Sequence, residues 1–216
     1  CGDLRYAYNL IEFCYYSFGN TFSIDQIKEI NSKPNFFHDK NEDAYYDLIS
    51  AFQKSIRGSD QDAAIYYLAR LLEGGDLESV CRRLNVVSYE DIGLANPLMG
   101  PKVDAAINSA IRLGLPEARI PLASIVIELA MSPKSNSAKV AIDSALNDIR
   151  SKDTGHVPEH LKTTSPNYKY PHLYKNYYIK QQYLPDKIKD KKYYIPKNNK
   201  YEKELFQFNT KIKKND

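Results

Sequence analysis

Two short patterns in the chain have the residue types and spacing of hydrolase active sites: a possible zinc site and a pair of carboxylates. His156, Glu159 and His160 form an H-x-x-E-H sequence, and a zinc site of this kind needs both histidines one turn apart on one face of a helix. Pro158 lies between the histidines and disfavours helical geometry at the residue before it. No third ligand is obvious nearby. We therefore interpret the segment as a turn and predict no metal site in the chain.

The adjacent carboxylates Glu90 and Asp91 form the second pattern, because paired carboxylates can perform acid–base chemistry. Adjacent residues on a helix, however, point about 100° apart. Salt bridges to Arg82 or Arg83, or helix capping, explain the pair better. An autonomous hydrolase that uses Glu90, Asp91 or His156 is therefore a weak hypothesis. It is weaker than the two developed below, a DNA-binding module and an oligomerisation module.

A phosphate-binding loop is absent from the sequence. No G-x-x-x-x-G-K-[ST] pattern occurs, and the nine glycines are scattered as turn residues. The chain therefore does not read as a complete P-loop ATPase. It begins at Cys1 rather than Met, and we expect it to be a piece of a longer protein.

Cysteine usage and hydropathy indicate a compartment. The three cysteines, Cys1, Cys14 and Cys81, are widely spaced and fit neither a disulfide framework nor a metal knuckle, which points to a reducing cytoplasm. No stretch approaches the roughly eighteen apolar residues of a membrane span, and no signal peptide opens the chain. We expect a cytoplasmic protein with no membrane partner.

Charge divides the chain at residue 150. Residues 1–150 hold 15 Lys and Arg against 20 Asp and Glu, a net charge of −5. Residues 151–216 hold 15 Lys, no Arg and 7 acids, a net charge of +8, together with 9 of the 18 tyrosines. Lysines neutralise phosphates and aromatic rings stack on unpaired bases, so a DNA-binding module in residues 151–216 is one hypothesis. Interspersed acids and the missing arginine argue against it. We interpret this extension mainly as a strap across the helical body or a neighbouring subunit.

The elements that position these residues are helices. Apolar residues recur at helical spacing, and short neighbouring helices joined by short loops pack antiparallel. Pro121 falls inside one predicted helix and indicates a kink or the true start of that helix. Frequent prolines in the extension predict that it forms no long helix and is ordered by its tyrosines. The predicted helices cover residues 3–18, 23–30, 42–56, 60–72, 77–87, 103–113, 116–131 and 135–149, with a capping box at 23–26, Ser59 and Asp76 as further caps, and a linker over 31–41.

Several segments resemble one family, the AAA+ ATPases called replication-associated recombination protein A (also MgsA), related to the Werner helicase-interacting ATPase. Residues 2–9 (GDLRYAYN) match the family's G-D-x-R-x-A-x-N stretch. Residues 46–59 (YDLISAFQKSIRGS) match its Y-D-L-I-S-A-x-x-K-S-x-R-G-S stretch. The matches cover nearly the whole chain in order and are together highly specific. Further matching segments are residues 63–70, 88–93, 116–119, 133–136, 157–161 and 193–196.

The resemblance implies that residues 1–35 are the end of the AAA+ lid. Arg5 would be its sensor-2 arginine, which approaches the phosphates of a nucleotide bound by a core that lies outside this chain. The family often has a second arginine next, where this chain has Tyr6. The resemblance implies ATP and Mg²⁺ as cofactors of the full-length protein, with no cofactor and no catalytic residue in this fragment.

Residues 40–216 then resemble the family's C-terminal oligomerisation domain. The implied fold is mainly α: a helical body over 40–150, similar to the collar of clamp loaders, and an irregular Tyr/Lys/Pro-rich extension over 151–216. The implied function is to form the homotetramer of an ATPase that acts at stalled replication forks, in replication, recombination and repair. Fork or single-stranded DNA and single-stranded DNA-binding protein would be partners of the full-length protein in the bacterial nucleoid. The matched polar residues are interpreted as buried or interface groups: Lys54, Arg57, Tyr66, Arg70, Glu90, Asp91, Lys134 and Asn136.

Overall fold

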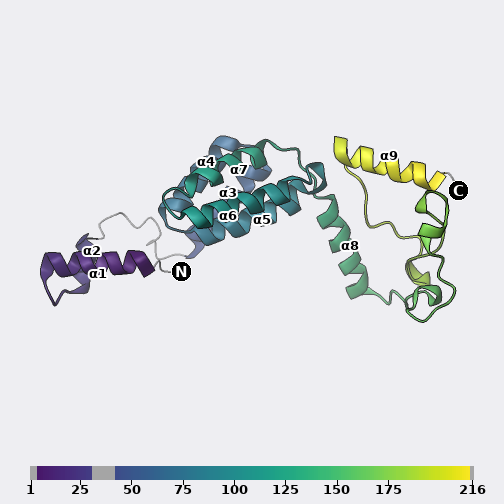
Figure 1. Cartoon of the computed structure of the whole chain (residues 1–216), viewed down its shortest axis with the longest axis horizontal. Helices are drawn as coiled ribbons and strands as arrows, with labels where there is room; N and C mark the ends of the chain where they lie inside the picture. Colours follow the sequence, from purple (N-terminus) through teal and green to yellow (C-terminus); the bar gives the residue numbers. More distant parts are fainter. Residues whose placement is uncertain (1–3, 31–41, 215–216) are drawn as a thin grey trace. The chain divides into compact units, whose positions relative to one another are not determined.

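α-Helices joined by turns form the chain in this computed structural model, which describes residues 4–30 and 42–214 (Figure 1). Those residues contain no strand, so the predicted mainly α fold is confirmed. The chain divides into two units, residues 1–45 and residues 46–216. None of the described helices is long and apolar enough to span a bilayer.

The first unit contains α1 (Leu4–Phe18) and α2 (Ile24–Ile30). Gly19 follows α1 with a φ of +84°, and its N–H donates to the Tyr15 carbonyl oxygen at 2.8 Å. A residue in this left-handed conformation ends a helix, and glycine adopts it without steric cost. Gly19 therefore ends α1 in the predicted way.

α2 begins with the predicted capping box. The Ser23 N–H donates to Gln26 Oε1 at 2.8 Å, and the Gln26 N–H donates to Ser23 Oγ at 3.2 Å. The two bonds satisfy N–H groups that have no partner inside the helix. The predicted linker over residues 31–41 lies outside the described residues. The division into residues 1–35 and 40–216 therefore stays a prediction.

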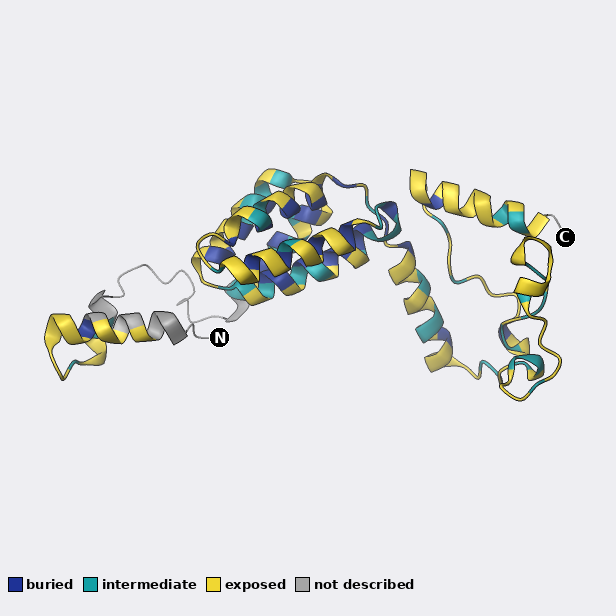
Figure 2. Cartoon of the chain, viewed as in Figure 1, coloured by how far each residue is buried: buried dark blue, intermediate teal, exposed yellow. Residues whose placement is uncertain are grey.

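The body of the second unit is a bundle of helices α3 to α7. α7 packs along both α4 and α6, and α5 packs against the same two helices (Figure 1). Their facing sides are buried, as the dark blue residues of Figure 2 show, and each fully buried large side chain contributes about 1.5–3 kcal/mol. The helices are α3 (Glu42–Arg57), α4 (Gln61–Glu73), α5 (Leu77–Val87), α6 (Met99–Leu113) and α7 (Arg119–Met131). The core includes Phe52, Ile56, Leu68, Leu71, Val80, Leu84, Val103, Leu122 and Leu129.

Aspartates cap the starts of α4 and α5. The Asp60 carboxylate accepts from the Ala63 N–H at 2.9 Å, and the Asp76 carboxylate accepts from the Ser79 N–H at 3.1 Å. The prediction for Asp76 is confirmed. The prediction for Ser59 is wrong by one residue, because Ser59 lies in the preceding turn with a φ of +61°.

Prolines lie in the first turns of α6 and α7, where their missing N–H groups cost no hydrogen bond. α6 begins at Met99, one turn before the predicted start, and contains Pro101 as its third residue. α7 begins at Arg119 rather than at Pro116. Pro121 is therefore the third residue of α7, and it marks the true start of that helix, which was one of its two predicted outcomes.

A π-helical turn over Ser88–Ile92 follows α5, and the apolar spacing does not predict it. A 3₁₀ turn continues from it, and Gly93 in this turn has a φ of +45°. A Cβ atom at Gly93 would lie 2.5 Å from the Ser135 carbonyl oxygen, so only glycine permits this approach. The approach brings the loop between α7 and α8 against the π turn.

α8 (Ser137–Ser151) leads into the extension, which is irregular apart from short 3₁₀ turns as far as α9 (Lys200–Lys214). The expectation that the extension forms no long helix is wrong for α9, because no proline follows Pro196. Tyr193 hydrogen-bonds to the buried carboxylate of Asp148 in α8, as expected of a strap across the body, whereas Tyr194 bonds to Glu202 within the extension. Most of the segment between α8 and α9 is nevertheless exposed or partly exposed (Figure 2).

Candidate functional site

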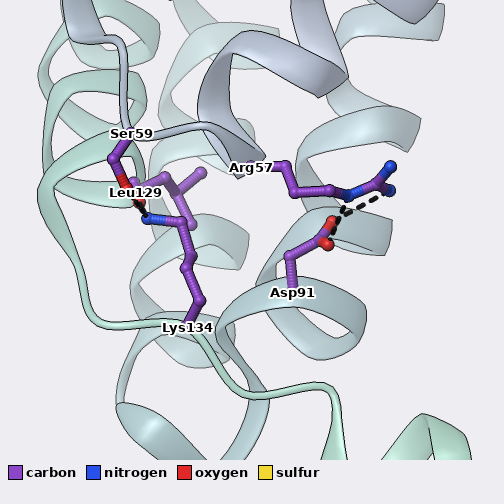
Figure 3. Close-up of polar contacts among 5 residues, drawn as sticks. All are labelled: Arg57, Ser59, Asp91, Leu129 and Lys134. Atoms are coloured by element: carbon purple, nitrogen blue, oxygen red, sulfur yellow. Dashed lines mark hydrogen bonds and ion pairs between the residues drawn. The ribbon is translucent and has the colours of Figure 1, made fainter.

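Arg57 and Asp91 pair where the end of α3 meets the π turn (Figure 3). Arg57 donates through Nε to Asp91 Oδ1 at 2.6 Å and through Nη2 to Oδ2 at 3.3 Å. The Asp91 side chain is 9% exposed and that of Arg57 is 47% exposed, so the carboxylate is the buried partner. The hydrogen bond to Asp91 raises the pKa of Arg57. The predicted pairing of Asp91 with Arg82 or Arg83 is therefore wrong.

Lys134 ties the end of α7 to the turn between α3 and α4. Its Nζ donates to the carbonyl oxygens of Ala130 at 2.8 Å and Ser132 at 2.6 Å, and to Ser59 Oγ at 3.0 Å. The Leu129 carbonyl oxygen lies at 3.3 Å (Figure 3). Carbonyls in the last turn of a helix lack intrahelical partners, and a cation there also complements the helix dipole. Burial lowers the pKa of Lys134.

Asp91 also joins this junction to the loop that precedes α8. Its carbonyl oxygen accepts from the Ser135 N–H at 2.7 Å, next to the close approach of Gly93. α3, the π turn and the loop after α7 therefore meet at one polar junction, formed by Arg57, Asp91 and Lys134. This junction holds three of the predicted site residues.

Glu202 anchors the start of α9 to the same loop, and it is fully buried. Its Oε1 accepts from Ser135 Oγ, from Ser137 Oγ at 3.1 Å and from Asn199 Nδ2 at 2.9 Å. Burial alone raises the pKa of this carboxyl, but hydrogen bonds, first from Ser135, lower it to about 2. The carboxylate is therefore ionised and held by neutral donors. Its Oε2 accepts from Tyr194 OH at 2.9 Å and the Lys197 N–H at 2.8 Å.

Asp148 anchors the middle of the extension to the end of α8. Its Oδ1 pairs with Lys152 Nζ at 2.8 Å, and its Oδ2 accepts from Tyr193 OH at 3.0 Å and Lys191 Nζ at 3.2 Å. The bond from Lys152 is the main cause that lowers the pKa of Asp148 to about 2, with burial opposing it and Lys191 and Tyr193 adding to it. Two buried carboxylates thus hold the extension to the rest of the second unit.

Lys54, Tyr66 and Arg70 lie on exposed surfaces of α3 and α4. Tyr66 is 57% exposed and packs edge-on against Tyr67, with ring centroids 5.3 Å apart. The Arg70 guanidinium lies 5.9 Å from the centroid of the Tyr66 ring, within the range of a cation–π contact. These side chains are available to a partner, and none of them joins the polar junction.

Glu90, Asn136 and Arg5 complete the predicted set. Glu90 is partly buried in the π turn, and Asn136 is exposed at the start of α8, where its side chain makes no capping bond. Arg5 lies in α1, but its side chain lies outside the described residues, so its role as sensor 2 stays a prediction.

The buried polar side chains of the described residues are paired. Every buried side-chain nitrogen and oxygen among them has a partner, and they contain no group of three or more His, Cys, Asp or Glu side chains that could hold a metal ion. The H-x-x-E-H segment forms the predicted turn, because Pro158 is extended and a 3₁₀ turn follows it. His160 Nε2 lies 2.7 Å from the Gln182 carbonyl oxygen.

Sequence reasoning missed both Asp148 and Glu202. A signal for Glu202 exists, since Asn199 and Glu202 form the N-x-x-E pattern of a capping box. The Glu202 N–H donates to Asn199 Oδ1 at 2.9 Å. This pattern could have predicted the start of α9. No local pattern marks Asp148, whose partner Tyr193 lies 45 residues away.

Comparisons with known proteins agree with the helical organisation. A family model described as MgsA AAA+ ATPase C terminal matches residues 58–213, and one described as AAA C-terminal domain matches residues 1–57. Replication-associated recombination protein A of Bacillus subtilis is 52% identical over 99% of this chain and 55% of its own length. The protein of the same name in Haemophilus influenzae is 36% identical over 91% of this chain and 48% of its own length. ATPase WRNIP1 of Dictyostelium discoideum is 31% identical over 78% of this chain and 21% of its own length.

The chain spans about half the length of these bacterial relatives. The first family model covers most of the second unit, from the turn between α3 and α4 to the last turn of α9. The resemblance predicted from the motifs is confirmed. The chain belongs to the MgsA AAA+ ATPase C-terminal family.

Proposed function

We propose that this chain is the tetramerisation module of a longer AAA+ ATPase that acts at stalled forks in DNA replication, recombination and repair. The family and the printed names of the bacterial relatives support the role in replication and recombination. The observation that carries the self-association is α8, which buries no apolar side chain within the single chain.

The apolar face of α8 lacks cover in the single chain. Every residue of α8 is described, and the buried ones are Ser137 and Asp148. Ile142 and Ile149 are 57% and 63% exposed, and the partly buried Leu146 lies between them on the same face. Helices in proteins owe most of their stability to the packing of such a face. We infer that a neighbouring copy covers it.

α9 presents a second apolar face with the same spacing. Tyr201, Leu205 and Phe208 are 40%, 42% and 65% exposed, and they recur at intervals of four and three residues. A single self-complementary face closes a dimer, whereas larger rings and tetramers need further contacts. Two uncovered faces on each copy therefore support a tetramer rather than a dimer.

We place ATP binding and hydrolysis, with Mg²⁺, in the part of the longer protein that lies outside this chain. The residues present do not fit a nucleotide site, since the sequence lacks a phosphate-cradling glycine-rich loop. We expect the fragment alone to be non-catalytic. In the whole protein, Arg5 would contact the γ-phosphate and report its presence.

The partners of the whole protein follow from the same proposal. We expect replication-fork or single-stranded DNA and single-stranded DNA-binding protein to bind the assembled ATPase in the nucleoid of the bacterial cytoplasm. The names of the bacterial relatives, which refer to replication and recombination, support this expectation.

Light scattering coupled to size exclusion tests the self-association. We expect a mass of four chains, and we expect the double variant Ile142→Glu/Ile149→Glu to fall to a dimer held by the face of α9, because charge on the uncovered face of α8 opposes its burial. A monomeric wild-type chain at tens of micromolar would contradict the proposal.

A matched control separates the face of α8 from the charge that is added to it. Ser144→Glu/Asn147→Glu adds the same two charges to exposed positions on the opposite side of α8. We expect this variant to remain a tetramer. Circular dichroism should show that both variants keep their helix content. A lower mass of the assembly then reports on the interface and not on folding.

A further inference from the structure

We propose that the segment 168–183, here named the tyrosine loop, binds single-stranded nucleic acid by stacking bases on its exposed tyrosine rings. This site deepens the proposed function, in which the whole protein binds single-stranded DNA, and it rests on that proposal for its ligand but not on the self-association. The loop lies between α8 and α9, in the part of the extension that neither buried carboxylate anchors directly.

The charge of the tyrosine loop is uniformly positive. The extension as a whole mixes Lys with acids, but residues 160–185 contain 4 Lys, 6 Tyr and no Asp or Glu. Among the described ion pairs, none involves Lys169 or Lys175. The acids that weaken the case for nucleic acid binding in residues 151–216 therefore lie outside this stretch. The loop offers cations to phosphates without competing carboxylates of its own.

The rings of the tyrosine loop are open to solvent. Tyr168, Tyr170, Tyr177 and Tyr183 are 42%, 51%, 73% and 50% exposed. The His172 ring lies between two of them, with centroids 5.0 Å from Tyr170 and 5.6 Å from Tyr177. Side chains with so much apolar surface normally become buried or meet a partner. Grouped rings of this kind form a platform on which unpaired bases can stack.

Hydrogen bonds join the two arms of the tyrosine loop at Lys169 and Gln181, so the arms are held together before a ligand binds. Gln181 Nε2 donates to the Lys169 carbonyl oxygen at 2.8 Å and to Tyr183 OH at 2.8 Å. The Lys169 N–H donates to Gln181 Oε1 at 3.4 Å. A pre-organised surface loses less entropy when it binds.

The backbone at the tip of the tyrosine loop, at Asn176 and Tyr177, is strained, and the Tyr177 ring there is exposed. Asn176 and Tyr177 both have a φ of +56°, a conformation that bulky residues rarely adopt. Tyr177 is at the same time the most exposed tyrosine of the loop. Strained residues of this kind cluster at functional sites. The tip therefore leaves most of the Tyr177 ring exposed, beside the His172 ring.

The chemistry of the loop favours an unpaired strand over other ligands. A duplex hides the faces of its bases, and reading its major groove commonly uses arginine, which residues 151–216 lack. An acidic peptide would pair with the lysines but would leave the rings without a role. An unpaired strand uses both, because its phosphates meet lysines while its bases stack on tyrosines.

Fluorescence anisotropy with labelled oligo(dT) and the whole chain tests the proposal, with oligo(U) and a duplex as further probes. We expect oligo(dT) or oligo(U) to bind more tightly than the duplex. Tyr170→Ala/Tyr177→Ala should weaken binding at least about fivefold, whereas Tyr170→Phe/Tyr177→Phe, which keeps both rings, should bind like the wild type. Lys169→Gln/Lys175→Gln should lower the slope of log affinity against log salt by about 1.4.

Tyr15→Ala/Tyr16→Ala is the matched control. These tyrosines are 51% and 78% exposed and pack edge-on with centroids 5.7 Å apart, but they belong to the first unit. Equal loss of binding in this control would overturn the proposal, as would absence of oligo(dT) and oligo(U) binding at tens of micromolar. If Tyr170→Ala/Tyr177→Ala changes the mass of the assembly and leaves nucleic acid affinity unchanged, the rings form a subunit contact and the proposal is wrong.

Discussion

Three buried carboxylates, on Asp91, Asp148 and Glu202, connect segments that are distant in the sequence. Asp91 pairs with an arginine 34 residues before it, and Glu202 accepts from a serine 67 residues before it. A buried carboxylate without donors would be costly, so each one fixes the position of the segments that supply its donors. At the scale of single residues, these carboxylates decide where the π turn and the extension lie.

Asp91→Asn tests the junction between α3 and the π turn. The variant keeps the shape of the side chain but removes the charge that Arg57 meets, and we expect the free energy of unfolding to fall by about 1–2 kcal/mol. Urea denaturation measures the change. Glu128→Gln is the control, since it breaks the pair with Lys102, in which both side chains are nearly half exposed, and should cost at most about 1 kcal/mol. Equal effects of the two variants would contradict a special role for the junction.

Glu202 makes the folding stability of the chain depend on pH in the acidic range. Its pKa is about 2 in the folded chain and 4.5 in a free side chain, so the unfolded state binds more protons between these values. The stability from this group is complete above about pH 4.5 and is lost as the pH falls through about 2. Asp148 adds a loss of the same sign between 3.8 and about 2.

Glu202→Gln should flatten this part of the pH profile and destabilise the chain at neutral pH. A fixed N–H donor faces each carboxylate oxygen, from Lys197 and from Asn199, so the new amide NH₂ group opposes a donor in either orientation. Thermal unfolding between pH 2 and pH 7 measures both effects. Glu204→Gln, at an exposed position of the same helix, should reproduce the wild-type profile. A wild-type profile in Glu202→Gln would refute the anchor.

At the scale of elements, local signals predicted the body well and the connections poorly. Apolar spacing and the caps predicted at Ser23, Ser59 and Asp76 mark helix starts to within about a residue or a turn, with Asp60 in place of Ser59, because such signals act over a few neighbouring residues. The π turn has no such signal, since it depends on contact with Ser135 from a distant loop. Proline spacing hid α9, although its N-x-x-E capping pattern is present.

The same reason limits what could be predicted of the candidate site. Motifs singled out Arg57, Asp91 and Lys134: Arg57 and Asp91 pair with each other, and Lys134 lies in the neighbouring loop, which bonds to the π turn through Ser135. The motifs did not show which cation Asp91 meets, because that depends on how α3 packs against the π turn. The sequence likewise does not show which tyrosines of the tyrosine loop are exposed, because the exposure of each ring depends on how the extension folds.

Gly93→Ala tests the contact between the π turn and the loop before α8. The new Cβ atom would meet the Ser135 carbonyl oxygen at 2.5 Å, so the backbone must move. Gly75→Ala is the matched control, because Gly75 also has a positive φ, of +79°, but no atom within 4 Å of the new Cβ. We expect Gly75→Ala to cost about 1 kcal/mol in urea denaturation and Gly93→Ala at least about 1 kcal/mol more. Equal losses of unfolding free energy in the two variants would show that the loop before α8 moves away without cost, which would contradict a tight contact at Gly93.

At the scale of the whole molecule, the acidic body and the basic extension offer a second way for copies to associate. Residues 1–150 carry a net charge of −5 and residues 151–216 carry +8, so one copy could attract the extension of another. The ion pair between Asp148 and Lys191 satisfies part of this attraction within one chain. The uncovered faces of α8 and α9 offer apolar contacts instead.

Salt separates these two modes of association. The Debye length falls from about 10 Å at 0.1 M salt to about 3 Å at 1 M, so contacts between opposite surface charges weaken while apolar burial does not. We therefore expect light scattering to give the mass of four chains at both salt concentrations. Nucleic acid binding by the tyrosine loop should weaken steeply over the same range, because it releases counterions from phosphates. A tetramer that falls apart at high salt would assign the assembly to the charged surfaces and would remove the role proposed for the α8 and α9 faces.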